Sequence, residues 1–289
     1  MELVDYLKTR VAPGTAARYM REIDPFFLSM ERKNINPKTA TYSELMEYIG
    51  ERRKRYKNAA TIGCVLQAVK HYYAYLIATG QRKDNPAKSI RLRDKRGRDI
   101  QLQDLFRTEE LEMLLDRKER YPILKNRNLI ITSLLIYQGL NNGEIKNLEL
   151  KDLNLEEASI YIKATRKTNQ RTLKLHSNQI FWLMKYLSDD RPRLLKTTTE
   201  ILIISKLGTP EGGEGIGYVI ECQKHLFPQR KLNPKTIRQS VITNLLKQGK
   251  DLRLVQAFAG HKYPSTTELY KQTEVELLKT QILKYHPLG

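Results

Sequence analysis

The sequence predicts a mainly α-helical protein with a small antiparallel sheet, divided between two domains. Its 289 residues fit two domains of ordinary size. Apolar residues recur at helical spacing through the first 80 residues, whereas strand-like segments follow one another only over residues 153–175. We therefore expect an all-helical N-terminal domain at 1–87, a basic linker at 88–106 and an α+β domain at 107–289.

Four helices are predicted in the N-terminal domain from the spacing of its apolar residues. The first covers 3–11, and the next two are expected to begin at hydroxyl caps, Thr15 and Ser43. The fourth and longest covers 61–79 and is expected to end at Gly80.

The second domain is predicted to mix helices with three strands. A capping signal at 108–111 opens it, and the apolar helix over 126–138 is expected at its buried centre. The expected strands, with a polar turn between the last two, cover 153–155, 159–162 and 171–175. Further helices are expected at 142–148, 177–188, 216–226, 234–248 and 251–259. The glycine-rich segment 208–217 lacks the Gly-Lys-Thr/Ser ending of a nucleotide-binding loop, so we interpret it as a flexible connection.

The net charge of +19 is the strongest bulk signal in the sequence. Residues 1–98 hold 21 Lys and Arg against 10 Asp and Glu, and the remaining residues hold 30 against 22, so both parts are basic. Such a surface favours a polyanion, and nucleic acid is the first candidate. A membrane surface is a weaker alternative, because no basic stretch carries a lipid-facing aromatic stripe. A basic protein without a polyanionic partner is the other alternative.

Two basic segments are candidates for contact with DNA phosphates. The run at 52–55 is expected between two helices, and the segment 88–98 holds six basic residues, as in an extended linker. A run of this kind is commonly only a solvated face, but beside a helix N-terminus in a basic protein it also suits phosphate contact. The candidate DNA-binding residues are Arg52, Arg53, Lys54, Arg55, Arg91, Arg93 and Arg96.

Neither a membrane nor a secretory pathway is indicated. The sequence has no run of about 18 apolar residues and no apolar signal region at its N-terminus. Cys64 and Cys222 have no metal-ligand spacing, as expected of free thiols in a reducing cytosol.

The last 60 residues hold the groups that phosphate chemistry needs. Tyr270 follows His261 by nine residues, and a Ser-Thr-Thr run that can open a helix lies between them. Lys235 and Arg238 are three apart and share a helix face. A phenol attacks a phosphate only where cations stabilise the phenolate or its target, and Arg suits bidentate phosphate contact. No acidic cluster with metal-ligand spacing is visible, which favours a metal-free transfer over a two-metal nuclease.

Taken in order, these motifs resemble the tyrosine recombinase (phage integrase) family over nearly the whole chain, in a compact, Xer-like two-domain form. Each motif is weak alone, and their order and spacing carry the resemblance. The motifs are Gly139-Leu140 with Glu144, the strand pair around Lys167, the helix with Arg238, Gly260-His261, and Tyr270. The resemblance implies a core-binding domain at 1–87 and a catalytic domain at 107–289.

The resemblance also implies a role for each site residue. Tyr270 would attack the scissile phosphate and form a 3′-phosphotyrosyl link. Arg238 would hold the nonbridging oxygens, and His261 would hydrogen-bond the phosphate. Lys167 would protonate the leaving 5′-oxygen, although a solvated turn lysine is the alternative. Lys235 stands where the family usually has His, and its ammonium can still serve the phosphate.

Asn141 departs from the family pattern, which usually has Arg directly after Gly-Leu. A neutral amide cannot neutralise a phosphate, and losing such an Arg typically costs several kcal/mol of transition-state stabilisation. Another cation would fill the gap, or the enzyme would be slow or inactive; we expect it to be active. The candidate cations are Arg127, Lys146, Arg166 and Arg171.

The predicted function is therefore a site-specific DNA recombinase or integrase of a mobile element, working without a metal or cofactor in the cytoplasm, at the nucleoid. Its expected partners are double-stranded DNA at specific recombination sites and further copies of itself in a homotetramer on paired sites. An amphipathic helix at 273–285 would dock into a neighbouring protomer; the alternative is that it packs on its own domain. Two alternatives to this function are a recombinase-fold accessory protein with impaired chemistry and, fitting less well, a type IB topoisomerase-like enzyme.

Overall fold

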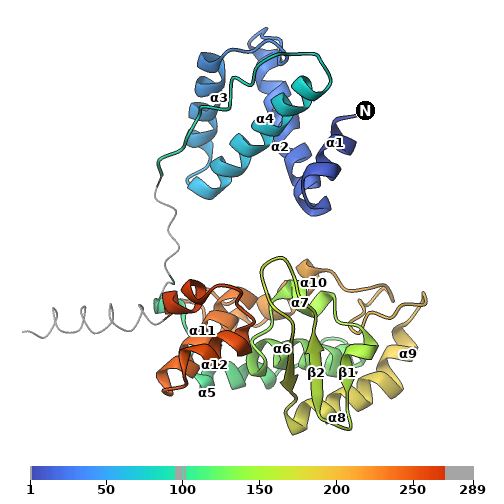
Figure 1. Ribbon diagram of the computed structural model, residues 1–289. Helices are drawn as coiled ribbons and strands as arrows, with labels where there is room; N and C mark the ends of the chain where they lie inside the picture. Colours follow the sequence, from blue (N-terminus) through green and yellow to red (C-terminus); the bar gives the residue numbers. More distant parts are fainter. Residues whose placement is uncertain (1, 95–99, 101, 271–289) are drawn as a thin grey trace, which may run out of the picture. The chain divides into compact units, whose positions relative to one another are not determined.

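The computed structural model describes residues 2–94, 100 and 102–270, and these residues fall into two compact units that divide between positions 98 and 99 (Figure 1). The linker is shorter than the predicted 88–106. Ile90 packs into the core of the first unit, and Phe106 is buried in the core of the second. Both ends of the predicted linker are thus held by a domain, because their apolar side chains gain more from burial than from exposure.

The first unit is all helical, as predicted. Its helices are α1 (Leu3–Arg10), α2 (Pro13–Arg32), α3 (Tyr42–Arg55) and α4 (Ala59–Ala78). Both predicted hydroxyl caps are wrong. Helix α2 begins at Pro13, whose fixed φ suits the first helical position, and α3 is capped by Thr41 in a capping box with Glu44.

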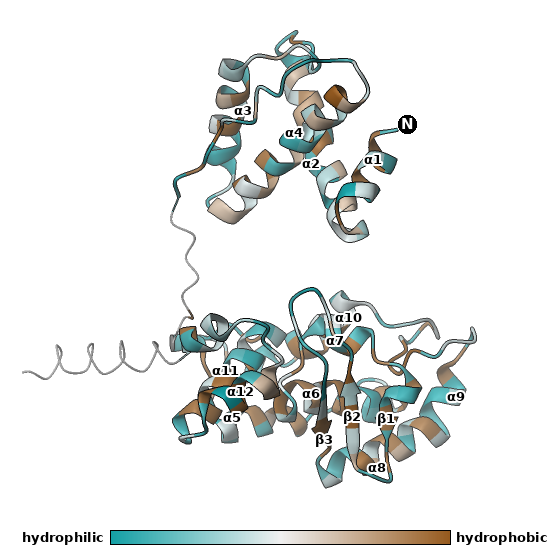
Figure 2. Ribbon diagram, in the orientation of Figure 1, coloured by the Kyte–Doolittle hydropathy of each residue, from teal (hydrophilic) through white to brown (hydrophobic). Residues whose placement is uncertain are grey.

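The second unit surrounds α6 (Lys125–Tyr137), which is buried on nearly all sides, as its apolar sequence predicts. Helix α8 (Ser177–Lys185) packs against it. The strands form one antiparallel sheet in the order β1-β2-β3, with bounds Leu153–Asn154, Ser159–Ile162 and Arg171–Lys174. In Figure 2, brown hydrophobic segments occur on helices of both units.

The remaining helices of the second unit are α5 (Thr108–Glu112), α7 (Asn142–Lys146), α9 (Arg191–Leu194), α10 (Gly213–Glu221), α11 (Pro234–Lys247) and α12 (Leu252–Ala259). A further helix begins at Pro264 and is described as far as Tyr270. Short 3-10 or π turns lie at Leu102–Asp104, Met113–Leu115, Pro122–Leu124, Leu150–Asp152, Tyr186–Asp190 and Lys224–Leu226.

One predicted loop is partly helical. Helix α10 begins at Gly213, inside the segment 208–217 that the glycines mark as a flexible connection. Its buried Ile216, Val219 and Ile220 outweigh the low helix propensity of glycine, because they pack into the core. Helix α11 contacts both α6 and α12, which places the C-terminal part of the unit beside its buried centre. Over the described ranges, no helix is both long and apolar enough to cross a membrane.

Candidate active site

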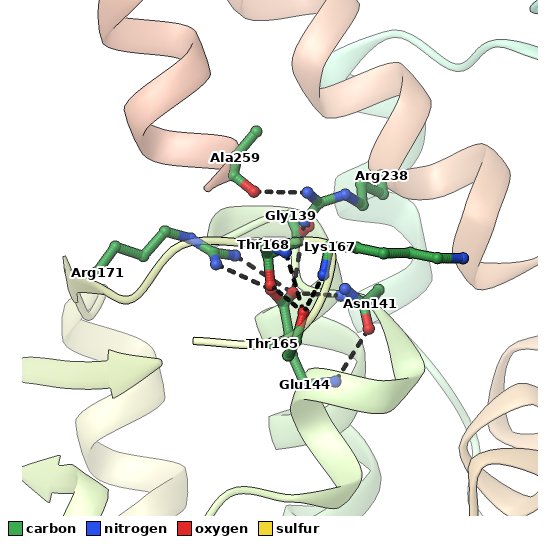
Figure 3. Close-up of polar contacts among 9 residues, drawn as sticks. All are labelled: Gly139, Asn141, Glu144, Thr165, Lys167, Thr168, Arg171, Arg238 and Ala259. Atoms are coloured by element: carbon green, nitrogen blue, oxygen red, sulfur yellow. Dashed lines mark hydrogen bonds and ion pairs between the residues drawn. The ribbon is translucent and has the colours of Figure 1, made fainter. Parts of the chain in front are cut away.

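A buried carboxylate, that of Glu144 on α7, joins two arginines that are far apart in the sequence (Figure 3). Arg171 donates from Nη1 to Oε1 at 2.8 Å and from Nη2 to Oε2 at 3.2 Å. Arg238 reaches Oε2 from Nη1 at 3.5 Å. Burial raises the pKa of Glu144, but the hydrogen bonds and charges of the two arginines hold that pKa below its usual value. One negative and two positive charges leave this cluster with an excess of one positive charge.

Arg238 connects the turn before α7 to the end of α12. Its Nη1 donates to the Gly139 carbonyl at 2.5 Å, and its Nη2 donates to the Ala259 carbonyl at 2.6 Å. The residue is only 8% exposed. Burial lowers the pKa of Arg238, whereas the negative charge of Glu144 raises it. A guanidinium nevertheless stays protonated in proteins. The structure thus holds a charged arginine against Gly139-Leu140 and Gly260-His261, two motifs that the sequence singled out.

Asn141 has a structural task at the start of α7. Its Oδ1 accepts a hydrogen bond from the Glu144 amide at 2.9 Å, while the Glu144 carboxylate accepts one from the Asn141 amide at 3.0 Å. This is a capping box, and Asn is among the best residues for it. An arginine has no acceptor atom in its side chain and could not make this cap.

Of the four candidate cations, Arg171 is the one that contacts Glu144 in the described structure. Arg127 is buried elsewhere, where it pairs with Glu211 at 2.7 Å and donates to the Ile204 carbonyl at 3.0 Å. Lys146 and Arg166 have exposed side chains, on α7 and on the turn between β2 and β3.

Arg171 also explains a glycine in the site. Gly260 ends α12 with a φ of 69°, a conformation that side chains rarely adopt. A Cβ atom at Gly260 would lie 2.5 Å from Nη1 of Arg171. The close approach of the guanidinium and the positive φ both require glycine at this position.

The turn that carries Lys167 is bound to the turn that carries His261. Thr168 and His261 form an antiparallel bridge, and the Asn169 amide donates to the Gly260 carbonyl at 2.8 Å. The Lys167 amide donates to the Thr165 hydroxyl at 3.1 Å, which fixes the backbone of the turn. The Lys167 side chain is exposed and extends away from Glu144 in Figure 3.

His261 is buried and neutral. The residue is 7% exposed, and its Nδ1 lies 2.9 Å from Oγ1 of Thr267. Burial, with the charges of Arg238 and Arg171, lowers the pKa of His261 to about 4. At neutral pH the ring therefore carries one proton, and it can give one hydrogen bond.

Tyr270 lies on a helix after the His261 turn, as predicted, although that helix begins at Pro264 rather than in the Ser-Thr-Thr run. Its ring is nearly parallel to that of His261, with centroids 6.1 Å apart and an interplanar angle of 15°. Tyr270 is 9% exposed and belongs to a small apolar cluster with Ile242 and Val255. Burial raises the pKa of Tyr270, and the charge of Arg238 lowers it. The phenol is thus protonated at rest, with a cation close enough to stabilise its anion.

Lys235 stands apart from these groups in the described structure. It lies in the first turn of α11 and its side chain is exposed, whereas Arg238, one turn later, is buried. The structure therefore brings Arg238, His261 and Tyr270 together and leaves both predicted lysines on the surface.

The basic run at 52–55 is the last turn of α3, so its predicted position between helices is wrong. Arg52 is 7% exposed and pairs with Glu22 at 3.2 Å, which makes it a structural residue. Arg53 pairs with Asp94 at 2.6 Å. The other described candidates have exposed side chains: Lys54, Arg55, Arg91 and Arg93. Arg96 and the predicted helix at 273–285 lie outside the described residues.

Sequence analysis missed the roles of two residues in this site. Glu144 follows Asn141 by three residues, which is the spacing of a capping box and could have indicated the cap. Thr267 gave no usable signal, because a threonine in a Ser-Thr-Thr run indicates a helix start rather than a partner for a histidine. In the part of the chain that the structure describes, no group of three or more His, Cys, Asp or Glu side chains could hold a metal ion.

The helical first unit, the small sheet and the convergence of Arg238, His261 and Tyr270 define a tyrosine-type site-specific recombinase. Residues 105–276 match the phage integrase family, and residues 2–80 match the phage integrase N-terminal SAM-like domain. The chain belongs to the phage integrase family, which confirms the predicted family and class of enzyme.

The chain is similar to curated relatives along most of its length. It is 25% identical over 278 residues to the tyrosine recombinase XerC of Anoxybacillus flavithermus, covering 94% of this chain and 91% of that protein. It is 26% identical over 285 residues to the tyrosine recombinase XerD of Oceanobacillus iheyensis, covering 96% and 93%.

Solved structures show the same fold. The pre-cleavage complex of the XerH recombinase bound to difH substrate matches with a TM-score of 0.66 and 23% identity, over 81% of this chain and 68% of that one. The Tn1549 transposon integrase, in complex with transposon right-end DNA, matches with a TM-score of 0.64 and 16% identity, over 99% of both chains.

Proposed function

We propose that this protein cuts and rejoins DNA strands at specific recombination sites, with Tyr270 as the nucleophile. The convergence of Arg238, His261 and Tyr270 from three separate segments carries this proposal. The Tyr270 oxygen attacks the scissile phosphorus, the bond to the 5′-oxygen breaks, and a 3′-phosphotyrosyl link and a free 5′-hydroxyl result. The new phosphodiester retains the energy of the broken one, so a second 5′-hydroxyl can reverse the step.

Each nearby polar group has a place in this transfer. Arg238 holds the nonbridging oxygens, because a guanidinium offers two parallel donors to a phosphate. His261, which is neutral, donates one hydrogen bond to the phosphate. Lys167 protonates the leaving 5′-oxygen, and its exposed side chain on a backbone-anchored turn can reach toward bound DNA. Lys235 adds positive charge at the start of α11.

Arg171 supplies the charge that Asn141 does not. It offsets Glu144, and this leaves the charge of Arg238 for the phosphate. Without Arg171, the charges of Glu144 and Arg238 would cancel, and this cluster would offer the phosphate no excess positive charge. The active site therefore keeps its electrostatic stabilisation while position 141 serves as a helix cap.

The residues that we assign to the transfer are largely buried. Arg238, His261 and Tyr270 are 8%, 7% and 9% exposed. Little of each residue is therefore exposed at the surface that the phosphate must approach.

We also propose the cellular setting and assembly of the enzyme. A net charge of +19, with Lys54, Arg55, Arg91 and Arg93 exposed, suits a protein that grips double-stranded DNA, with an affinity that falls steeply as salt rises. Four copies act on two paired sites, and the helix at 273–285 docks into a neighbouring copy. The protein acts in the cytoplasm, at the nucleoid, on behalf of a mobile element.

The test is a nicked suicide substrate that carries the protein's own site, isolated by selection from random DNA. We expect a covalent protein–DNA adduct that is lost in Tyr270→Phe and kept in Tyr263→Phe. Tyr263 is the matched control, because it is 69% exposed and only seven residues away. A wild-type protein that binds the site tightly yet gives no adduct would instead favour the second candidate, a DNA-binding accessory factor. The neutral Asn141 is the observation that favours that candidate.

A further inference from the structure

Thr267 is a buried side chain that the chemistry described so far does not use. It is 0% exposed, and its Oγ1 lies 2.9 Å from Nδ1 of His261. It precedes Tyr270 by three residues on the same helix, so the two side chains lie on neighbouring positions of one face. The helix of the nucleophile therefore also carries the partner of the histidine.

The hydrogen bond between Thr267 and His261 determines which ring nitrogen holds the proton. A neutral imidazole has one N–H and one acceptor nitrogen. Among the contacts of the described residues, His261 is the one side-chain or carbonyl partner of the Thr267 hydroxyl. If Nδ1 held the proton, the buried hydroxyl proton would have no acceptor, at a cost of about 1–3 kcal/mol. The favoured arrangement has the hydroxyl donating to Nδ1, so that the ring proton lies on Nε2.

We propose that Thr267 is a positioning residue that holds His261 in the Nε2–H form, so that the ring donates a hydrogen bond to the scissile phosphate. The other form would turn a lone pair toward the phosphate oxygens and repel them. The identity of the acceptor rests on the proposed function, whereas the position of the ring proton does not.

The form of the ring can be measured directly on the full-length protein without DNA. Nitrogen-15 spectra at neutral pH distinguish protonated from unprotonated ring nitrogens, and His261→Gln identifies the signals of His261 among the five histidines. We expect a protonated Nε2 and an unprotonated Nδ1 in the wild type and in Thr267→Ser. Thr267→Val, which keeps the shape and loses the hydroxyl, should give a mixture of the two forms.

Cleavage of the suicide substrate gives the second measurement. We expect Thr267→Val to cleave roughly tenfold more slowly with unchanged DNA binding, and Thr267→Ser to restore the rate. Thr266→Val, at the half-buried neighbouring position, is the matched control and should cleave normally. A protonated Nδ1 in the wild type would overturn the proposal, even if Thr267→Val failed to fold. An unchanged ring form and rate in Thr267→Val would do the same. The wild type could show a protonated Nε2 on His261 and yet never cleave the suicide substrate. That result would refute the proposed function, but it would leave intact the inference that Thr267 sets the position of the ring proton.

Discussion

The Arg171 guanidinium and the Glu144 carboxylate form a two-point ion pair, at 2.8 and 3.2 Å, with side chains that are only 6% and 1% exposed. This pair links strand β3 to helix α7, and it borders both Gly260 and Arg238. A buried pair of this kind is costly to break, because the remaining ion loses its partner where water cannot replace it. The pair that leaves the charge of Arg238 available for the phosphate therefore also stabilises the folded active site.

Replacing Arg171 tests that dependence. We expect Arg171→Gln to lower the free energy of unfolding by about 3 kcal/mol, because the buried Glu144 loses its main cation. Chemical denaturation measures the change. Arg166→Gln, an exposed arginine on the preceding turn, should change stability by less than about 0.5 kcal/mol. If the two variants lowered the free energy of unfolding equally, the buried Arg171–Glu144 pair would contribute no more to stability than an exposed arginine does.

Two substitutions at Asn141 separate its capping role from the charge it lacks. Both Asn141→Ala and Asn141→Arg remove the cap, so each should lower stability by about 1 kcal/mol. Only Asn141→Arg adds a cation where the family usually has one, and we expect it to keep or raise the rate of cleavage relative to Asn141→Ala. Adduct formation on the suicide substrate is the measurement. Loss of cleavage in Asn141→Arg, with DNA binding intact, would contradict our account of this position.

His261 makes stability depend on pH in a defined window. Its pKa is about 4 in the folded protein and about 6.5 in an unfolded chain. Between these values the unfolded chain binds the extra proton, so the free energy of unfolding falls as pH drops from about 6.5 to about 4. In His261→Gln this contribution should be absent, and in His225→Gln, at an exposed position, it should persist. Denaturation curves at several pH values decide the point; the same slope in both variants would refute the assignment.

Glycine-to-alanine changes at two positions should have opposite signs. Gly260→Ala places a methyl group 2.5 Å from Arg171 at a φ of 69°, so it should destabilise the protein by more than about 1 kcal/mol and slow cleavage. Gly50→Ala, inside α3 with nothing within 4 Å of the new Cβ, should stabilise it by about 0.5–1 kcal/mol. Thermal melting measures both. If Gly260→Ala left the melting temperature unchanged, the Arg171 side chain would have to move away from the new methyl group at no cost in stability.

Much of the fold could be predicted from local patterns in the sequence. The apolar helix α6 and the strands β2 and β3 were predictable, because burial on all sides and alternation leave distinct periodicities. The spacing between His261 and Tyr270 likewise survives in the structure as a turn followed by a helix. These features depend on residues close together in the sequence.

Features set by tertiary packing were less predictable. Thr41 and Ser43 both offer a hydroxyl at the start of α3, and the choice of cap depends on how the helix packs. Arg52 is buried although its neighbours Arg53 and Arg55 are exposed, because the face that α3 turns inward depends on α2 and α4. The pairing of Arg171 with Glu144 also depends on tertiary packing, because the two residues lie 27 positions apart in the sequence. It could not be predicted from local patterns.

Because one helix carries both Thr267 and Tyr270, the position of that helix affects two parts of the active site together. The nucleophile, Tyr270, and the hydrogen-bond partner of His261, Thr267, lie three residues apart on the same helix. If that helix withdraws, the attacking oxygen leaves and His261 is freed to change its proton at the same moment. Displacement of this one helix would thus remove the nucleophile and the histidine alignment together.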